Sequence, residues 1–103
     1  MTSDKSGKLG AADVDTRLRA MPSWKWIDEA LVREFKFPTF RDAVVFIVRL
    51  GFEAEERDHH PDLDVRYRKV LVRWSTHSEG GVTQKDFDGT EQSDRIAQHL
   101  GGQ

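Results

Sequence analysis

One strongly apolar helix constrains the fold of this chain more than any other segment. Thr39 follows Pro38, and Asp42 lies three residues after Thr39, the spacing of a capping box with Asp in place of the usual Glu. One face then carries apolar residues at helical spacing: Phe40, Ala43, Val44, Ile47, Leu50, Gly51 and Ala54. This face is widened by Val45, Phe46 and Val48. We therefore expect the helix to pack on a sheet and also to touch a second element or subunit.

The length and composition place the chain among small single-domain proteins. Its 103 residues suffice for one domain, and a net charge of -2 argues against the basic face of a nucleic-acid-binding protein. The absence of cysteine excludes disulfides and fits a reducing cytosol, and no apolar run approaches the roughly 20 residues that span a bilayer. We expect a cytoplasmic protein without direct nucleic-acid or membrane contacts. A flexible tail over residues 1–11 should precede one domain over residues 12–103.

Two elements are expected before the apolar helix. Residues 13–21 have the pattern of a short helix with Asp13 as its N-cap. Residues 24–27 and 31–37 are rich in aromatic and branched side chains, and Asp28-Glu29-Ala30 separates them. Such a pair of segments predicts a β-hairpin.

The segment after the apolar helix completes an α+β pattern. Residues 64–76 alternate and predict either one long bent strand or a tight hairpin that turns at Arg68-Lys69. Thr83 then caps a last helix that reaches about residue 100, with Asp86 at the third helical position. The element order is helix, two strands, helix, two strands, helix. This order predicts an antiparallel sheet with its helices on one face.

Three of the four histidines lie close to carboxylates. His59 and His60 are adjacent and precede Pro61, whereas His77 follows the second strand region. Histidine has the side chain whose ordinary pKa lies nearest neutrality, so a cluster of this kind suits proton transfer. Glu55 precedes His59 by four residues, which on a helix places both on one face and lets the carboxylate orient the imidazole. We predict the proton-handling site of an enzyme.

Other interpretations of these residues stay open. The adjacent histidines could only cap a helix C-terminus, His77 could be a turn residue, and Asp86 could serve only the capping box. The cluster could also bind zinc. However, neighbouring residues on a helix point about 100° apart, which makes joint ligation by His59 and His60 awkward, so we expect no metal. A core or interface position is expected for the tryptophans Trp24, Trp26 and Trp74.

The spacing of these residues resembles that of the pterin-4a-carbinolamine dehydratases. The family motif is an acidic residue, three further residues, His-His-Pro, an aromatic residue, a histidine about ten residues later, and an aspartate. The matching positions in this chain are Glu55, His59-His60-Pro61, Tyr67, His77 and Asp86. The resemblance extends over residues 18–97. Thr90 and Ser93 depart from the apolar or small residues usual in the family, which puts the packing of the last helix in question.

The resemblance implies a fold and an activity. The fold is a four-stranded antiparallel sheet with three helices on one face, in the order α-β-β-α-β-β-α. Homodimers would join their sheets edge to edge, and homotetramers are common in the family. We expect the strand with the alternating residues Val70, Val72 and Trp74 to form the edge that extends the sheet across two subunits. The activity is dehydration of 4a-hydroxytetrahydropterin to quinonoid dihydropterin, which recycles the pterin used by an aromatic amino acid hydroxylase. The pterin is the substrate, and no metal or other cofactor is implied.

The resemblance also implies roles for individual residues. His59 and His77 would be the main acid and base, and His60 would bind and orient the pterin. Glu55 would orient a histidine, and Asp86 would be a supporting carboxylate. The implied pterin-contacting positions are Asp58, His59, His60, Ser75, Thr76, His77 and Ser78. The alternative is a non-catalytic module on the same fold, since some relatives are dimerisation cofactors of a transcription factor or assembly factors.

Overall fold

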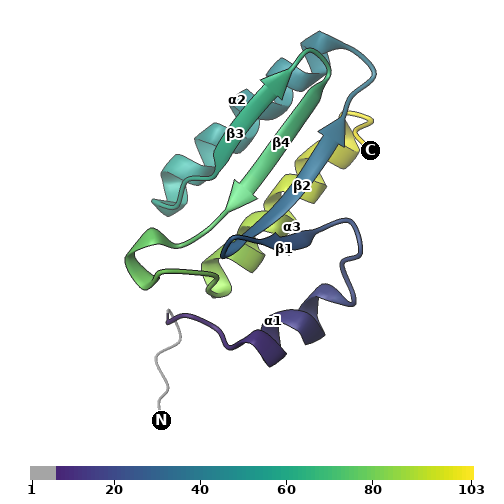
Figure 1. The fold of residues 1–103 in the computed structure, drawn as a ribbon. Helices are drawn as coiled ribbons and strands as arrows, with labels where there is room; N and C mark the ends of the chain where they lie inside the picture. The colour runs from purple at the N-terminus through teal and green to yellow at the C-terminus, as the bar shows by residue number, and fades with distance from the viewer. Residues whose placement is uncertain (1–6) are drawn as a thin grey trace.

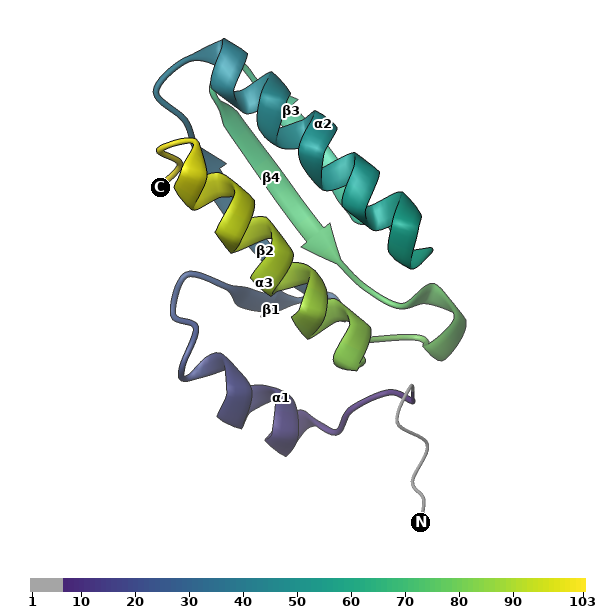
Figure 2. The same cartoon turned by 180° about the vertical axis from the view of Figure 1, so that it is seen from behind.

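The computed structural model describes residues 7–103, which form a four-stranded antiparallel sheet with helices against one face (Figures 1 and 2). The strands lie in the order β1-β2-β4-β3, and α2 and α3 cross one side of them. The elements are α1 (Ala11–Leu18), β1 (Lys25–Ile27), β2 (Ala30–Lys36), α2 (Phe40–Arg57), β3 (Asp62–Arg66), β4 (Lys69–Trp74), a 3₁₀ turn (His77–Glu79) and α3 (Gln84–His99). The predicted α+β class and element order are confirmed.

Both hairpins close through two-residue turns. Ile27 pairs with Ala30, and the intervening Asp28 and Glu29 have left-handed φ values of 51° and 61°, as a type I′ turn requires. In the second strand region the hairpin alternative is correct. Its turn lies at Tyr67-Arg68, one residue earlier than predicted, because Arg66 pairs with Lys69.

The position of β4 corrects the expected dimer edge. β4 pairs with β2 on one side and with β3 on the other, so it lies inside the sheet. Its alternating residues Val70, Val72 and Trp74 are fully buried against the helices instead of forming a free edge. The edges belong to β1 and β3. The expected edge-to-edge joining of two sheets in a dimer stays a prediction, and it would have to use β1 or β3 instead of β4.

The helix α2 buries part of the expected face, since Ala43, Leu50 and Ala54 are buried as predicted, but this face is rotated toward Phe46. Thr39 caps it as predicted, since its hydroxyl accepts the N–H of Asp42 at 3.0 Å. Phe46, expected only to widen the apolar face, is fully buried, and its ring centroid lies 4.9 Å from that of Phe37. Phe40 and Val44, placed on the packing face by periodicity, are instead 50% and 39% exposed. The helix is apolar on more than one side, so spacing alone did not select the buried face.

The N-terminal helix starts earlier than predicted. Its N-cap is Gly10, whereas Asp13 lies in the first turn and pairs with Arg17 at 3.1 Å. Of the predicted tail, residues 1–6 lie outside the described residues. Leu9 N–H donates to the carbonyl of Val82 at 2.8 Å, so the chain meets the domain at this point. Among residues 7–103, none of the helices has the length and apolar character needed to cross a bilayer.

Candidate active site

The candidate site is an open polar pocket of about 360 Å³ where α2 and β4 end and α3 begins. It is lined by Asp58, His59, His60, Ser75, Thr76, His77, Ser78 and Lys85. Seven of these residues were predicted as pterin-contacting positions, and the structure brings them together. A larger hollow of about 550 Å³ beside Phe40 and Val44 is lined without any carboxylate or imidazole, so it lacks groups for acid–base chemistry.

The end of α2 separates the two adjacent histidines from the helix. Asp58 has left-handed backbone angles, φ 52° and ψ 42°, and His59 N–H bonds back to the carbonyl of Ala54 at 3.1 Å. This is a Schellman-type end, and Pro61 further disfavours helical geometry at His60. The expectation that His59 lies on the helix above Glu55 is therefore wrong. Glu55 Oε1 lies 2.8 Å from His60 Nε2 instead.

His59 is held between a carboxylate and an aromatic ring. Its Nε2 lies 2.7 Å from Asp86 Oδ1, and its imidazole stacks on the indole of Trp74 with centroids 5.4 Å apart. Asp86 is fully buried, and its Oδ2 accepts hydrogen bonds at 2.8 Å from both Thr76 Oγ1 and Thr83 N–H. A carboxylate can only accept hydrogen bonds, so Nε2 carries a hydrogen in this pairing. Asp86 thus serves the capping box of Thr83 at the start of α3, as predicted, and is also the partner of His59.

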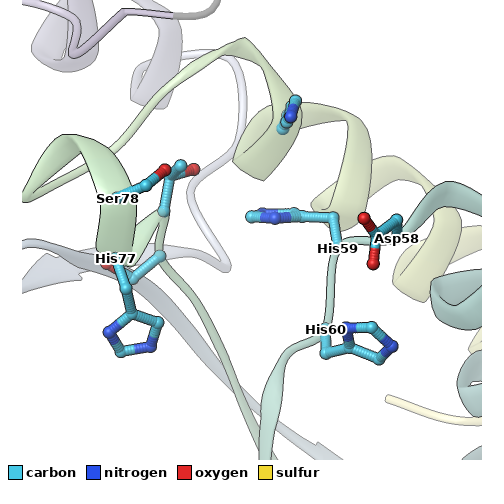
Figure 3. A pocket seen from close by; sticks show the side chains of 8 residues that line it. Asp58, His59, His60, His77 and Ser78 are labelled. Carbon is cyan, nitrogen blue, oxygen red and sulfur yellow. The ribbon is translucent and has the colours of Figure 1, made fainter.

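The opposite wall of the pocket is the turn after β4. Figure 3 shows the ring of His59 between Asp58 and His60 on one side and the turn of His77 and Ser78 on the other. His77 is exposed and opens the 3₁₀ turn. The main chain of Thr76 is already used inside this loop, because its N–H donates to Gly81 O at 2.9 Å and its carbonyl accepts Glu79 N–H at 3.0 Å.

Two residues of this region were missed by sequence reasoning. Lys85 lines the pocket from the first turn of α3, where the helix dipole disfavours a cation. A lysine at this unfavourable helix position could have indicated from the sequence that Lys85 has a role other than stabilising the helix. Trp74 was expected at a core or interface position and not at the site, and nothing in its strand alternation distinguishes it from Val70 or Val72. Its contact with His59 depends on how two distant elements meet.

The polar residues that depart from the family pattern in α3 have partners. Ser93 Oγ accepts Trp74 Nε1–H at 3.0 Å and donates to Gly89 O at 2.8 Å. Thr90 Oγ1 donates to Phe87 O at 2.7 Å. Both side chains are fully buried, and each is hydrogen-bonded. The two polar residues therefore do not prevent close packing of α3. Ser93 also fixes the indole on which His59 lies.

The clearest shifts of carboxyl pKa lie outside the pocket. Burial raises the pKa of Asp94, although Trp24 and Arg33 both donate hydrogen bonds to it. These contacts tie α3 to β2 and to the segment before β1, which is a structural role. Within residues 7–103, no three potential metal ligands among His, Cys, Asp and Glu side chains gather at one point.

Comparison with known proteins gives one family. The sequence model described as Pterin 4 alpha carbinolamine dehydratase matches residues 7–96. A protein of Mycolicibacterium smegmatis (strain ATCC 700084 / mc(2)155), provisionally named pterin-4-alpha-carbinolamine dehydratase, is 45% identical over 88 residues, covering 85% of this chain and 94% of the relative. A protein of Roseiflexus sp. (strain RS-1) with the same name is 40% identical over 89 residues, covering 86% and 96%.

Solved structures give the same result. A crystal structure described as a transcriptional coactivator/pterin dehydratase from Brucella melitensis has a TM-score of 0.84 and 36% sequence identity, and the match covers 88% of this chain and 99% of that one. A pterin dehydratase-like protein identified as a RuBisCO assembly factor in the alpha-carboxysome shares the fold, with a TM-score of 0.61 at 16% identity over 72% of this chain and 86% of that one. From the sequence match and the fold together, the chain belongs to the pterin 4 alpha carbinolamine dehydratase family, a family of hydro-lyases.

Proposed function

We propose that this protein dehydrates a 4a-hydroxytetrahydropterin to the quinonoid dihydropterin, as part of the recycling of a pterin used by an aromatic amino acid hydroxylase. One observation carries the proposal. In a chain of this family, the seven positions implied to contact the pterin line a single pocket of about 360 Å³, together with Lys85. The reaction releases water and needs one proton donor and one proton acceptor.

His59 is suited to be the donor. Asp86 engages its Nε2–H, so Nδ1 is the ring nitrogen that exchanges a proton with the substrate. As an imidazolium, His59 would protonate the 4a-hydroxyl, which leaves as water. The electron pair on the pterin N5 then forms the C4a=N5 bond, and His77 would take the N5 proton. General acid–base assistance of this kind contributes roughly 10²–10⁴ in rate.

His60 is suited to binding. Its Nε2 lies 2.8 Å from Glu55 Oε1, which fixes the ring beside the mouth of the pocket. Both partners are largely exposed, with side-chain exposures of 55% for His60 and 80% for Glu55. Water therefore screens this pair far more than it screens the buried Asp86, and the pair contributes less to stability. We assign His60 to orienting the pterin, with Glu55 as its support.

A direct dehydratase assay with enzymatically generated 4a-hydroxypterin tests the proposal. His59→Ala and His77→Ala should each lower kcat by about 10²-fold or more, whereas His60→Ala should mainly raise KM. His99→Ala is the matched control, since His99 is exposed at the end of α3 and outside the pocket. Activity should survive exhaustive chelation. Near-normal turnover in folded variants of all three pocket histidines would refute the assignment.

We further propose that the protein acts as a homo-oligomer. Phe40, Val44, Val48 and Phe52 line the outer side of α2 and are 50%, 39%, 49% and 70% exposed. The Phe40 ring stacks on Tyr67 of the β3–β4 turn at 6.4 Å, so this apolar strip continues toward the free edge of β3. Contiguous exposed apolar surface often marks a protein–protein contact site. A second copy could pair its β3 edge and cover α2 at the same time.

The second candidate function is an interaction module without catalysis. The protein from Brucella melitensis is described as a transcriptional coactivator as well as a pterin dehydratase, and the exposed strip on α2 of this chain offers a docking surface. The dehydratase assay separates the two functions. A module would tolerate loss of His59 and His77 but not charges placed on α2, whereas an enzyme requires the histidines.

A further inference from the structure

We propose that Thr76 is a positioning residue, whose hydroxyl acts through the buried Asp86 to hold His59 in its working tautomer and place. The kinetic part of this inference rests on the proposed function. Thr76 was expected to contact the pterin, and it does line the pocket, but only 6% of the residue is exposed and its hydroxyl is bonded to the buried Asp86. Its contribution to the reaction would therefore pass through another residue.

The direction of the hydrogen bonds around Thr76 follows from simple donor counting. Thr76 Oγ1 lies 2.8 Å from Asp86 Oδ2, and a carboxylate accepts only, so the single hydroxyl hydrogen of Thr76 points to Asp86. Thr83 Oγ1 lies 2.8 Å from Thr76 Oγ1 and must then be the donor of that bond. Thr83 Oγ1 in turn accepts Lys85 N–H at 3.2 Å. The result is a one-way chain of hydrogen bonds that ends on Asp86.

Asp86 is consequently held by donors from three segments of the chain. Thr83 N–H comes from the cap of α3, Thr76 Oγ1 from the loop after β4, and His59 Nε2 from the end of α2. Donors on both of its oxygens hold a buried carboxylate in place, and without the Thr76 hydroxyl Asp86 Oδ2 would keep only the bond from Thr83 N–H. Because Thr76 directly precedes His77, its hydroxyl also links the loop of His77 to the carboxylate that holds His59.

Positioning and substrate binding by Thr76 predict different kinetics. If the hydroxyl bound the pterin, its removal would raise KM, since uniform binding would be lost. If it positions His59, its removal lowers kcat and leaves KM nearly unchanged. A misplacement of about 1 Å in a catalytic group can cost up to ~10²-fold in rate.

The matched pair of variants is Thr76→Val and Thr76→Ser. Valine keeps the shape and removes the hydroxyl, so kcat should fall by about 10-fold to 100-fold, and serine should restore most of the activity. In a His59→Ala background the effect of Thr76→Val should largely disappear, because the residue through which it acts is gone. An equal loss in both backgrounds, or a loss confined to KM, would overturn the proposal. Thr76→Ala is the substitute if the valine variant does not fold.

A second measurement does not depend on the substrate. Nitrogen-15 NMR of the histidine rings should show His59 of the unaltered protein with hydrogen on Nε2, and this state should persist in Thr76→Ser. In Thr76→Val the Nε2 hydrogen should exchange faster with water, or both tautomers should appear. An unchanged signature in Thr76→Val refutes the positioning role whatever the activity. A changed signature in a protein without dehydratase activity would refute the proposed function and leave the positioning role standing.

Discussion

The imidazole of His59 lies nearly parallel to the indole of Trp74, with ring planes inclined by 21° and centroids 5.4 Å apart. The indole is itself held by two residues of α3, Ser93 and Gly89. Ser93 accepts its Nε1–H, and a Cβ atom on Gly89 would lie only 2.4 Å from Trp74 Cδ2. The absence of a side chain at Gly89 therefore permits the packing that supports His59.

Gly89→Ala should lower both stability and turnover. The added methyl group must displace the buried indole, and overpacking of this kind costs about 1–3 kcal/mol. Gly51→Ala is the control, since Gly51 is also helical but has open space where a Cβ would lie. That change should raise stability by roughly 0.5–1 kcal/mol. Thermal unfolding and kcat would be measured for both variants, and unchanged values for Gly89→Ala would contradict this account.

Asp86→Asn should reduce kcat by about 10²-fold or more, because an amide can donate to His59 Nε2 and reverse its tautomer. The chain offers a matched control in Asp42→Asn. Asp42 occupies the same position after the cap Thr39 of α2, far from any histidine contact. Asp86→Asn should also cost more stability in urea unfolding than Asp42→Asn, because Asp86 is fully buried and accepts three hydrogen bonds, whereas Asp42 accepts one from Thr39 at the exposed cap of α2. Only Asp86→Asn should affect turnover, and equal kinetic effects would speak against a specific role.

The exposed strip on α2 should mediate self-association. We expect light scattering at micromolar concentration to give at least a dimer mass, and Val48→Lys to shift it toward the monomer, because a charge would be buried in an apolar contact. Ile27→Lys is the control, since Ile27 is similarly exposed at 45% but lies on β1, at the opposite edge of the sheet from β3. A monomer mass for the unaltered protein would rule the association out.

The pair of Glu53 and Arg95 should give a pH-dependent contribution to stability. The hydrogen bond from Arg95 Nη2, 2.9 Å long, lowers the pKa of Glu53 below its ordinary value. The contribution is therefore complete above the ordinary carboxyl pKa and is lost as the pH falls through the lowered pKa. Glu53→Gln should cost roughly 0.2–1 kcal/mol at neutral pH and nothing in acid. Urea unfolding at both pH values tests this, and an equal cost at both would exclude the ion pair.

Local signals in the sequence were sufficient for the caps of α2 and α3 and for the first hairpin, but not for the cap of α1, which is Gly10 instead of Asp13. Thr39 and Thr83 were predicted as caps because their partners lie within three residues along the chain. The pairing of His59 with Asp86 was not predictable, because it depends on where the end of α2 meets the start of α3. The partner of Glu55 was assigned incorrectly for a related reason. The left-handed turn at Asp58, a non-glycine residue, removes His59 from the helical register and turns His60 toward Glu55.

The face buried by α2 and the place of β4 needed tertiary information. A helix that is apolar on more than one side fits a sheet in more than one rotation, and the cluster of Phe35, Phe37 and Phe46 selects one of them. Strand order cannot be read from alternation, which describes only the two faces of a strand. The burial of Val70 and Val72 follows from the insertion of β4 between β2 and β3.

The histidines and the buried carboxylate of the pocket all come from one continuous stretch of chain, from Glu55 at the end of α2 to Asp86 at the start of α3. The N-terminal elements meet this stretch through contacts such as the hydrogen bond from Arg17 Nη1 of α1 to Gln84 Oε1 and the hydrogen bond from Ser75 Oγ to the carbonyl of Glu29, in the turn after β1. Proteins open locally in cooperative units, so the N-terminal elements are expected to exchange their amide hydrogens by partial opening that leaves this stretch folded. We therefore expect the site to keep its structure while α1 and β1 fray, since β2 stays paired with β4.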